Sequence, residues 1–273
     1  MSKPYTLNEL LIIAVAKEIH DYENVVLGIG IPMTSGALAK ALYAPHCTLI
    51  MESGIFDFEP TVAVNHIADC LSCRGFSFAT DLFSTFTMTY RGFVDVCFLG
   101  VAQVDKYGNL NTTVIGDYDA PKIKLPGSGG AADFISYSKR TILTMRGGEF
   151  VEKLSYRTSP GYLDGGDSRD RTGHFPKGTG PTRLISTKGV FEFDPITKEM
   201  FLAKIHPGVS LAEIKKKVPW ELKVSPDLVE TERPTDDEIN FVRCFAPTES
   251  AGKNLANELA IASMAKQAKE RTI

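Results

Sequence analysis

The first part of the chain shows helical spacing of apolar residues, interrupted by one short apolar run. Residues 6–20 open with Thr6 and Glu9 at the spacing of a capping box and continue with apolar residues at helical intervals. The apolar run 25–27 and a glycine-rich turn then precede helical periodicity over 34–44. This order predicts an amphipathic helix, a strand, a tight turn and a second helix.

Continuous apolar runs at 48–51 and 94–100 are typical of strands that are buried on both faces. Further strands are expected at 110–115 and 141–145, with a glycine-opened helix over about 129–138 between them. Such alternation of strands and helices favours parallel pairing, so the pattern predicts a layered α/β sheet.

The pattern changes in the C-terminal half. Residues 161–180 are rich in Gly, Asp and Arg and predict a long loop. Segments 184–193 and 199–205 flank a polar turn and predict a β-hairpin. Two further capping-box spacings, which start at Ser210 and Thr235, predict two short helices.

Length and composition are those of an ordinary globular protein. With 273 residues, of which 43% are hydrophobic and 23% charged, the chain is long enough to bury a sizeable core. Neither an internal repeat nor a linker divides it. We therefore expect a single domain over 1–273, in which about 246–273 forms a peripheral helical tail.

Charge and hydropathy exclude several classes of partner. The 30 Lys and Arg residues nearly balance the 33 Asp and Glu residues, giving a net charge of −3. Because the basic residues are not interleaved with aromatic ones, we expect no nucleic-acid partner. No apolar stretch reaches the roughly 18 residues that a membrane span requires, and residues 1–4 lack an apolar signal core. We therefore expect no membrane association and a cytoplasmic location.

Cysteine and histidine spacing gives no support for a metal site. The five cysteines include one C-x-x-C pair, Cys70 and Cys73, but neither a second pair nor a suitable histidine pair completes a zinc site. Free thiols and no bound metal are the expectation. The five histidines have no G-x-S-x-G nucleophile to serve, so a histidine-based triad is not supported.

Glu52 is the position most suggestive of chemistry. It directly follows the apolar run 48–51 and precedes Ser53 and Gly54, so we expect it at the C-terminal end of a buried strand, where open α/β sheets bind ligands. Partial desolvation there would make an ionised carboxylate a better nucleophile. The residues alone leave a second interpretation equally open, namely a carboxylate that accepts backbone hydrogen bonds in a tight turn.

Two glycine-rich segments are candidate binding loops. Gly127, Gly129 and Gly130 precede a predicted helix, where backbone N–H groups can stabilise an oxyanion or a phosphate. A plain turn is the alternative. Gly28 and Gly30 follow the first strand, and either ligand contact or close strand-to-helix packing explains them. Neither segment matches a dinucleotide fingerprint or a Walker loop.

Several polar side chains could position a substrate, but each also has an ordinary structural explanation. Tyr107-Gly108-Asn109 predicts a hairpin turn, and the preceding Gln103 either points into a site or hydrogen-bonds this turn. Six arginines could each clamp a second carboxylate of a dicarboxylic substrate, although surface ion pairing is the commoner fate of an arginine. They are Arg74, Arg91, Arg146, Arg157, Arg169 and Arg171.

Four motifs occur in an order and spacing that resembles the β subunit of class I coenzyme A (CoA) transferases, with the closest likeness to the glutaconate type. The motifs are Gly28-Ile-Gly-Ile-Pro32, Met51-Glu-Ser-Gly54, Gln103-Val-Asp-Lys-Tyr-Gly-Asn109 and Gly127-Ser-Gly-Gly-Ala131. The likeness extends from about residue 5 to about residue 245. Four motifs in register are far more specific than any one of them.

The resemblance implies an open α/β/α fold and one catalytic glutamate per αβ pair, which corresponds to Glu52. The glycines that it places toward CoA or the oxyanion are Gly28, Gly30, Gly127, Gly129 and Gly130. It also implies an α subunit as partner, most simply in an α2β2 assembly, and a CoA thioester as substrate without a tightly bound cofactor. Succinyl-type relatives carry Asn where this chain has Ser53.

The expected reaction is an exchange of CoA between two carboxylic acids. Glu52 attacks the donor thioester and forms an acyl-glutamyl anhydride; the released CoA thiolate then forms a glutamyl-CoA thioester, and an acceptor acid reverses these steps. A dicarboxylate such as glutaconate is the nearest analogy for the acid. The alternatives are an acyl-CoA hydrolase or a ring-cleaving or decarboxylating lyase on the same fold, and a catalytically silent subunit.

Overall fold

The computed structural model describes residues 4–61, 63–64 and 66–245, which form two compact units. Unit 1 takes the described residues of Met1–Met88, Val94–Phe98 and Arg233–Ile273, and unit 2 takes Thr89–Phe93 and Leu99–Glu232. The expectation of a single domain stays a prediction, and the tail expected at about 246–273 lies outside the described residues.

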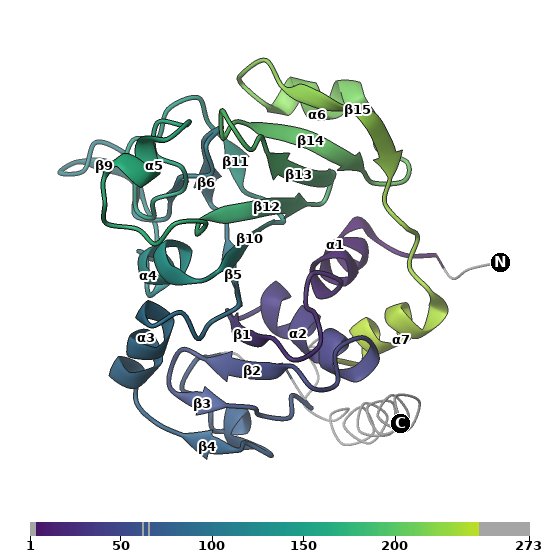
Figure 1. Ribbon diagram of the computed structural model, residues 1–273. Helices are drawn as coiled ribbons and strands as arrows, with labels where there is room; N and C mark the ends of the chain where they lie inside the picture. Colours follow the sequence, from purple (N-terminus) through teal and green to yellow (C-terminus); the bar gives the residue numbers. More distant parts are fainter. Residues whose placement is uncertain (1–3, 62, 65, 246–273) are drawn as a thin grey trace. The chain divides into compact units, whose positions relative to one another are not determined.

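Unit 1 combines a mixed sheet with several helices (Figure 1). Its strands are β1 (Asn24–Leu27), β2 (Thr48–Met51), β3 (Ile55–Phe56), β4 (Phe78–Ala79) and most of β5 (Val96–Gly100). Its helices are α1 (Leu7–Ala16), α2 (Ile31–Leu42), the 3-10 helix η1 (Cys70–Cys73), most of α3 (Leu82–Tyr90) and α7 (Asp236–Phe245). The strand order is β5-β1-β2-β3-β4; β1 is parallel to both neighbours, and β2, β3 and β4 are antiparallel.

Helices α1 and α7 begin where the sequence predicts, whereas α2 begins at Ile31, three residues before the predicted start. The Thr6 hydroxyl accepts a hydrogen bond from the Glu9 amide at 3.2 Å, and the Glu9 carboxylate accepts one from the Thr6 amide at 2.8 Å. Thr235 and Glu238 form the same reciprocal pair at the start of α7. These caps satisfy amide groups that a helix start leaves unpaired. Helices α1, α2 and α7 pack against one another, and their apolar faces are buried.

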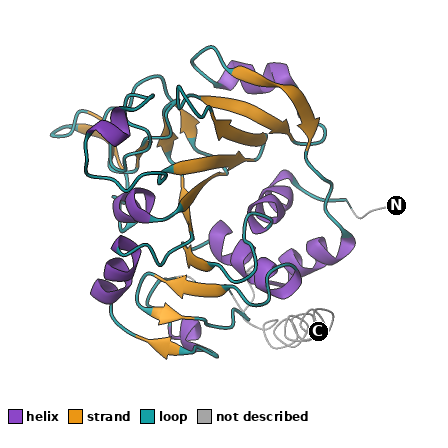
Figure 2. Cartoon of the chain, in the orientation of Figure 1, coloured by secondary structure: helices purple, strands orange, loops and turns teal. Residues whose placement is uncertain are grey.

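Unit 2 contains more strand and shorter helices (Figure 2). Its strands are β6 (Gln103–Val104), β7 (Leu110–Asn111), β8 (Val114–Gly116), β9 (Pro121–Lys124), β10 (Arg140–Met145), β11 (Glu149–Phe150), β12 (Pro181–Ser186), β13 (Gly189–Phe193), β14 (Met200–Ile205) and β15 (Lys223–Glu230). Its helices are α4 (Ala131–Tyr137), α5 (Ser168–Arg171) and α6 (Leu211–Lys217). The main strand order is β15-β14-β13-β12-β10, while β11-β6-β7 and β8-β9 form two small sheets.

The α/β class and the C-terminal hairpin, formed by β13 and β14, are confirmed. The expectation of one strand over 184–193 is wrong, because the Ser186 hydroxyl accepts hydrogen bonds from the amides of Lys188 and Gly189 and turns the chain between β12 and β13. The strand expected at 110–115 is likewise interrupted.

That interruption has the same kind of cause. The side-chain oxygen of Asn111 accepts hydrogen bonds from the amides of Thr113 at 3.1 Å and Val114 at 3.3 Å, so the chain turns between β7 and β8. The loop expected at 161–180 contains the single helical turn α5. Among the described residues, no helix has the length and apolar character needed to cross a membrane.

Candidate active site

The loop between β2 and β3 holds Glu52. Met51 and Ile55 are the closing pair of this antiparallel hairpin, and the Gly54 amide donates to the Met51 carbonyl at 2.9 Å. Glu52, Ser53 and Gly54 therefore form a three-residue hairpin loop. Gly54 has a φ of +104°, and a Cβ there would lie 2.4 Å from the Thr80 carbonyl oxygen, so only glycine fits.

Glu52 lies at the carboxyl edge of the parallel strands, as the sequence predicts. Leu27 of β1 is in register with Met51 of β2, so Gly28 and Glu52 are the next residues at the same edge. Strand β5 runs parallel on the other side of β1. The strand order reverses at β1, and ligands bind open α/β sheets at such a point. The Glu52 side chain is half-buried, so it is neither sealed in the interior nor fully solvated.

Ser53 is a feature that sequence reasoning did not single out. Its hydroxyl oxygen is buried and has no hydrogen-bond partner within the described part of the chain. A buried hydroxyl without a partner is unfavourable and uncommon in folded proteins. It is therefore a candidate donor to a group bound beside Glu52. The only sequence signal was the serine at the position where succinyl-type relatives carry Asn.

The amino end of α2 follows the same edge. Gly30 is its N-cap, with a φ of +82°, and a Cβ there would meet no atom within 4 Å. At Gly28 a Cβ would lie 3.6 Å from the Phe98 carbonyl oxygen, which is ordinary contact. Close strand-to-helix packing is instead made by Gly36, whose added Cβ would lie 2.4 Å from Leu27. Gly28 and Gly30 thus leave the positive end of the 12-residue helix α2 accessible.

The glycine segment of unit 2 is only partly available as a set of donors. Gly127 and Gly129 have φ values of +101° and +49°, and a Cβ at either would meet open space. The Gly127 amide donates to the Thr112 carbonyl at 2.7 Å, so it is already used. The amides of Gly129 and Gly130 make no hydrogen bond within the described ranges. Helix α4, which they precede, has seven residues.

The hairpin turn predicted at Tyr107-Gly108-Asn109 is confirmed and is internally satisfied. It joins the antiparallel strands β6 and β7. The Asn109 side-chain amide donates to Asp105 and to the Leu163 carbonyl, both at 2.7 Å, and its oxygen accepts from the amides of Gly161 and Leu163. Burial raises the pKa of Asp105, and the hydrogen bonds from Asn109 and Tyr107 oppose that rise. The turn has a structural role.

Gln103 and four of the six arginines also make structural contacts. Arg74 donates to the Thr61 hydroxyl at 3.1 Å. Gln103 bonds Asn111 and Glu149 at 2.9 and 3.0 Å. The buried guanidinium of Arg169 donates to four backbone carbonyls and to the Thr179 hydroxyl, and burial lowers its pKa to about 10. Exposed ion pairs join Arg157 to Asp164 and Arg171 to Asp167.

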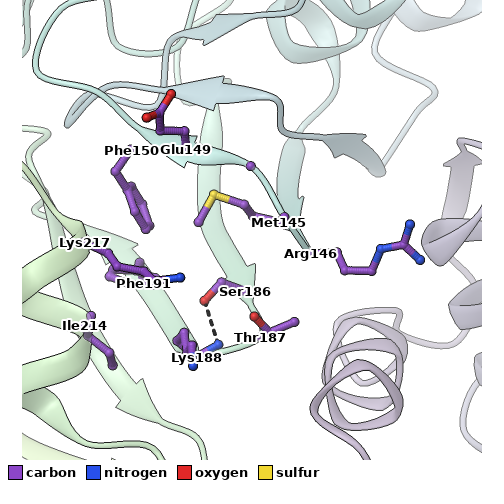
Figure 3. Close-up of a pocket in the computed structure, with 12 residues that line it drawn as sticks. Met145, Arg146, Glu149, Phe150, Ser186, Thr187, Lys188, Phe191, Ile214 and Lys217 are labelled. Atoms are coloured by element: carbon purple, nitrogen blue, oxygen red, sulfur yellow. Dashed lines mark hydrogen bonds between the residues drawn. The ribbon is translucent and has the colours of Figure 1, made fainter.

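Unit 2 contains a pocket of about 320 Å³ (Figure 3). It joins apolar side chains, which include Phe150 and Phe191, with the cationic side chains of Lys188 and Lys217. Lys188 is paired with Glu213. The lining comes from residues 145–150, 186–188, 191, 214 and 217, which are separated in the sequence, so no local motif could have revealed it.

Cys70 and Cys73 are free and exposed on η1, as expected. Across the described ranges, no group of three or more His, Cys, Asp and Glu side chains is arranged to hold a metal ion.

The fold and the candidate site define an α/β protein with a half-buried carboxylate at the carboxyl edge of its sheet, where such sheets bind ligands. The profile of the family described as coenzyme A transferase matches residues 8–217. The chain is 35% identical over 246 residues to the B subunit of glutaconate CoA-transferase from Acidaminococcus fermentans, covering 88% of this chain and 91% of that protein. It is 34% identical over 244 residues to the B subunit of 3-oxoadipate CoA-transferase from Pseudomonas knackmussii, covering 88% and 93%. This chain belongs to the coenzyme A transferase family.

The solved structures agree with this assignment and confirm the fold type. The crystal structure of glutaconate coenzyme A-transferase from Acidaminococcus fermentans matches with a TM-score of 0.82 and 33% identity, covering 89% of this chain and 95% of that one. The decarboxylase AibA/AibB matches with a TM-score of 0.75 and 27% identity, covering 93% and 98%. Human mitochondrial succinyl-CoA:3-ketoacid coenzyme A transferase 2 is 30% identical over 232 residues, which cover 78% of this chain but 39% of that protein.

Proposed function

We propose that this chain is the β subunit of an enzyme that exchanges CoA between an acyl-CoA and a carboxylic acid, with Glu52 as the nucleophile. The observation that carries the proposal is the half-buried Glu52 on a glycine-locked hairpin loop at the carboxyl edge of β1 and β2. A carboxylate held in this way keeps a fixed direction of attack and is only partly hydrated, and both features favour nucleophilic catalysis.

The proposed reaction proceeds through two covalent intermediates. The Glu52 carboxylate attacks the thioester carbonyl of the donor and expels CoA thiolate, which leaves an acyl-glutamyl anhydride. The thiolate attacks the glutamyl carbonyl, releases the donor acid and forms a glutamyl-CoA thioester. An acceptor carboxylate then takes the same steps in reverse. Each tetrahedral oxyanion needs N–H donors, and the family resemblance assigns this role to the glycine segment that contains Gly129 and Gly130.

The relatives support a proposal for the acid and for the partner subunit. The two B-type relatives are named for glutaconate and 3-oxoadipate, both dicarboxylic acids, so we propose a dicarboxylate as one of the two acids. CoA enters as a substrate thioester, without a tightly bound cofactor. An α subunit completes the enzyme, most simply as α2β2. A cytoplasmic location stays part of the proposal.

The test is the activity of the co-purified αβ complex toward a panel of acyl-CoA donors and acceptor acids. We expect a new acyl-CoA to form only when an acceptor acid is present, and we expect Glu52→Ala to abolish this exchange while the complex stays folded. Normal exchange by Glu52→Ala would end the assignment.

A second candidate function is decarboxylation, which the match to the decarboxylase AibA/AibB supports. Hydrolysis of the thioester is the third reaction to be separated. A hydrolase would release free CoA without an acceptor acid, and a decarboxylase would release CO2 while the thioester stays intact. The same assay therefore separates all three reactions.

A further inference from the structure

Unit 1 exposes several large hydrophobic side chains that are close together in the sequence. Five large hydrophobic side chains between residues 71 and 83 are exposed: Leu71, Phe76, Phe78, Leu82 and Phe83, with exposed fractions of 48%, 42%, 44%, 46% and 79%. We call these five residues the 71–83 face. Only Arg74 and Asp81 carry charge within this stretch. Several exposed large hydrophobic side chains with so little charge beside them are typical of a protein–protein contact.

The backbone at this face is equally unprotected. Within the described residues, β4 is the last strand of the sheet, and it pairs with β3 on one side only. Both of its residues, Phe78 and Ala79, are exposed. Edge strands of free proteins are usually shielded by charged residues, proline or a covering segment, because an open apolar edge invites aggregation. This edge has the composition of a surface that another protein covers.

The 71–83 face is joined directly to the loop of Glu52. The Thr80 amide donates to the Gly54 carbonyl at 2.8 Å, and the Thr80 carbonyl packs against the Gly54 Cα. The Phe56 ring of β3 stacks on the Phe78 ring with 4.3 Å between centroids. In Figure 1 the chain runs from β4 directly into α3, which begins with Leu82 and Phe83. A protein bound to this face would therefore reach the rim of the Glu52 loop.

The relatives indicate which protein covers the face. In the single-chain human relative, the segment that matches this chain is 39% of the polypeptide, so most of that protein consists of additional chain. The two relatives of 35% and 34% identity are instead separate B subunits of nearly the same length as this chain. The human relative carries its additional polypeptide on the same chain. A separate B subunit must instead bind its partner protein through a surface.

We propose that the 71–83 face is the docking surface for the α subunit, which presents an apolar surface to it and thereby shields the Glu52 loop from water. This proposal rests on the proposed function. Exclusion of water matters there because both the anhydride and the enzyme thioester hydrolyse.

The test is assembly of the tagged chain with its co-expressed α subunit, measured by light scattering and by an equilibrium Kd without substrate. We expect Phe83→Asp to raise Kd roughly 30-fold or more, as for a central hot spot. Ile196→Asp, at a side chain that is 81% exposed in unit 2, is the matched control and should leave Kd unchanged. Thermal unfolding of each free variant checks the fold, and Phe83→Ala replaces Phe83→Asp should the latter be unstable.

Each outcome decides the proposal. An unchanged Kd in Phe83→Asp would overturn it, as would a free chain that is dimeric and becomes monomeric in this variant, since a second copy would then cover the face. A failure of the proposed CoA exchange gives a different result from a failure of the docking surface. A complex whose assembly depends on Phe83 but which exchanges no CoA would contradict the reaction and leave the docking surface intact.

Discussion

Two hairpin turns, one in each unit, differ in how their polar groups are satisfied. In the β6–β7 turn, every polar atom of the Asn109 side chain is bonded within the protein, and Asp105 accepts three hydrogen bonds from the turn itself. In the β2–β3 turn, the Ser53 hydroxyl is buried without a partner in the described chain, beside a half-buried Glu52.

The difference separates a turn that serves the fold from one that serves a reaction. Hydrogen bonds made within the protein lower the free energy of the folded state, and they leave no polar group of the turn available to a ligand. An unsatisfied group beside a carboxylate lowers stability but becomes useful when a substrate binds. The turns also share a feature, a glycine in the left-handed region at Gly54 and at Gly108.

The largest expected effect is on catalysis at Glu52. Glu52→Asp withdraws the carboxylate by one methylene, and because a displacement of about 1 Å at a reacting group costs roughly 10²-fold, we expect kcat/KM to fall by roughly that factor. Steady-state kinetics with a fixed donor and acceptor measure this. Stability should change by less than about 0.5 kcal/mol, since the side chain is half-buried. Unaltered kinetics would remove Glu52 from the reaction.

The second prediction concerns the other turn. Asn109→Ala removes four hydrogen bonds of a fully buried side chain, so we expect it to lower the free energy of unfolding by about 2 kcal/mol. Denaturant titration at neutral pH measures the loss. In complexes that remain folded, the exchange rate per active site should be unaffected; a specific loss of kcat would give this turn a role that its geometry does not suggest.

The same variant should show a defined pH dependence. Burial raises the pKa of Asp105, and the Asn109 side chain opposes that rise, so Asn109→Ala raises this pKa further. A raised carboxyl pKa favours folding below the ordinary value of 3.8, and this contribution is lost as pH rises through the folded-state pKa. The stability deficit of Asn109→Ala relative to wild type should therefore be larger at pH 7 than below pH 3.8. A deficit independent of pH would show that Asp105 is not coupled to it.

The third prediction uses the shared glycines. A Cβ at Gly54 would lie 2.4 Å from the Thr80 carbonyl oxygen, and one at Gly108 would lie 2.8 Å from the Phe193 ring. Because both residues also have positive φ, we expect Gly54→Ala and Gly108→Ala each to destabilise by about 1–2 kcal/mol. Only Gly54→Ala should lower kcat, since only that turn aims Glu52. Equal losses of activity in both variants would contradict the distinction between the turns.

The smallest effect is expected at Ser53. Ser53→Ala removes a buried hydroxyl that has no partner in the described chain, so stability should stay constant or rise. If the hydroxyl donates to a bound substrate, kcat/KM should fall by roughly 2- to 10-fold, the value of one hydrogen bond. Thermal unfolding and kinetics on the same preparation give both results, and a destabilised variant with normal kinetics would make Ser53 purely structural.

Local patterns in the sequence were sufficient for most of the elements around the candidate site. Capping-box spacing predicted the starts of α1 and α7, and the apolar run 48–51 placed Glu52 at the end of β2. These features depend on neighbours within four residues, and short-range patterns report them reliably. The strands β3 and β4, with two residues each, carry no detectable period.

Long-range contacts were the part that the sequence could not provide. The use of the Gly127 amide by Thr112, the locking of Gly54 by Thr80 and the burial of Arg169 each depend on residues far away in the chain. The 71–83 face was not predicted, because it is defined by the exposure of its side chains. Periodicity alone does not distinguish an exposed apolar strand from a buried one.

The decisive measurement for Glu52 as nucleophile is the mass of the β subunit after the αβ complex is incubated with an acyl-CoA in the absence of acceptor acid. We expect a covalent CoA adduct that maps to the peptide containing Glu52, is removed by hydroxylamine and is absent in Glu52→Ala. A complex that exchanges CoA without an adduct, or with the adduct on another residue, would contradict this role of Glu52.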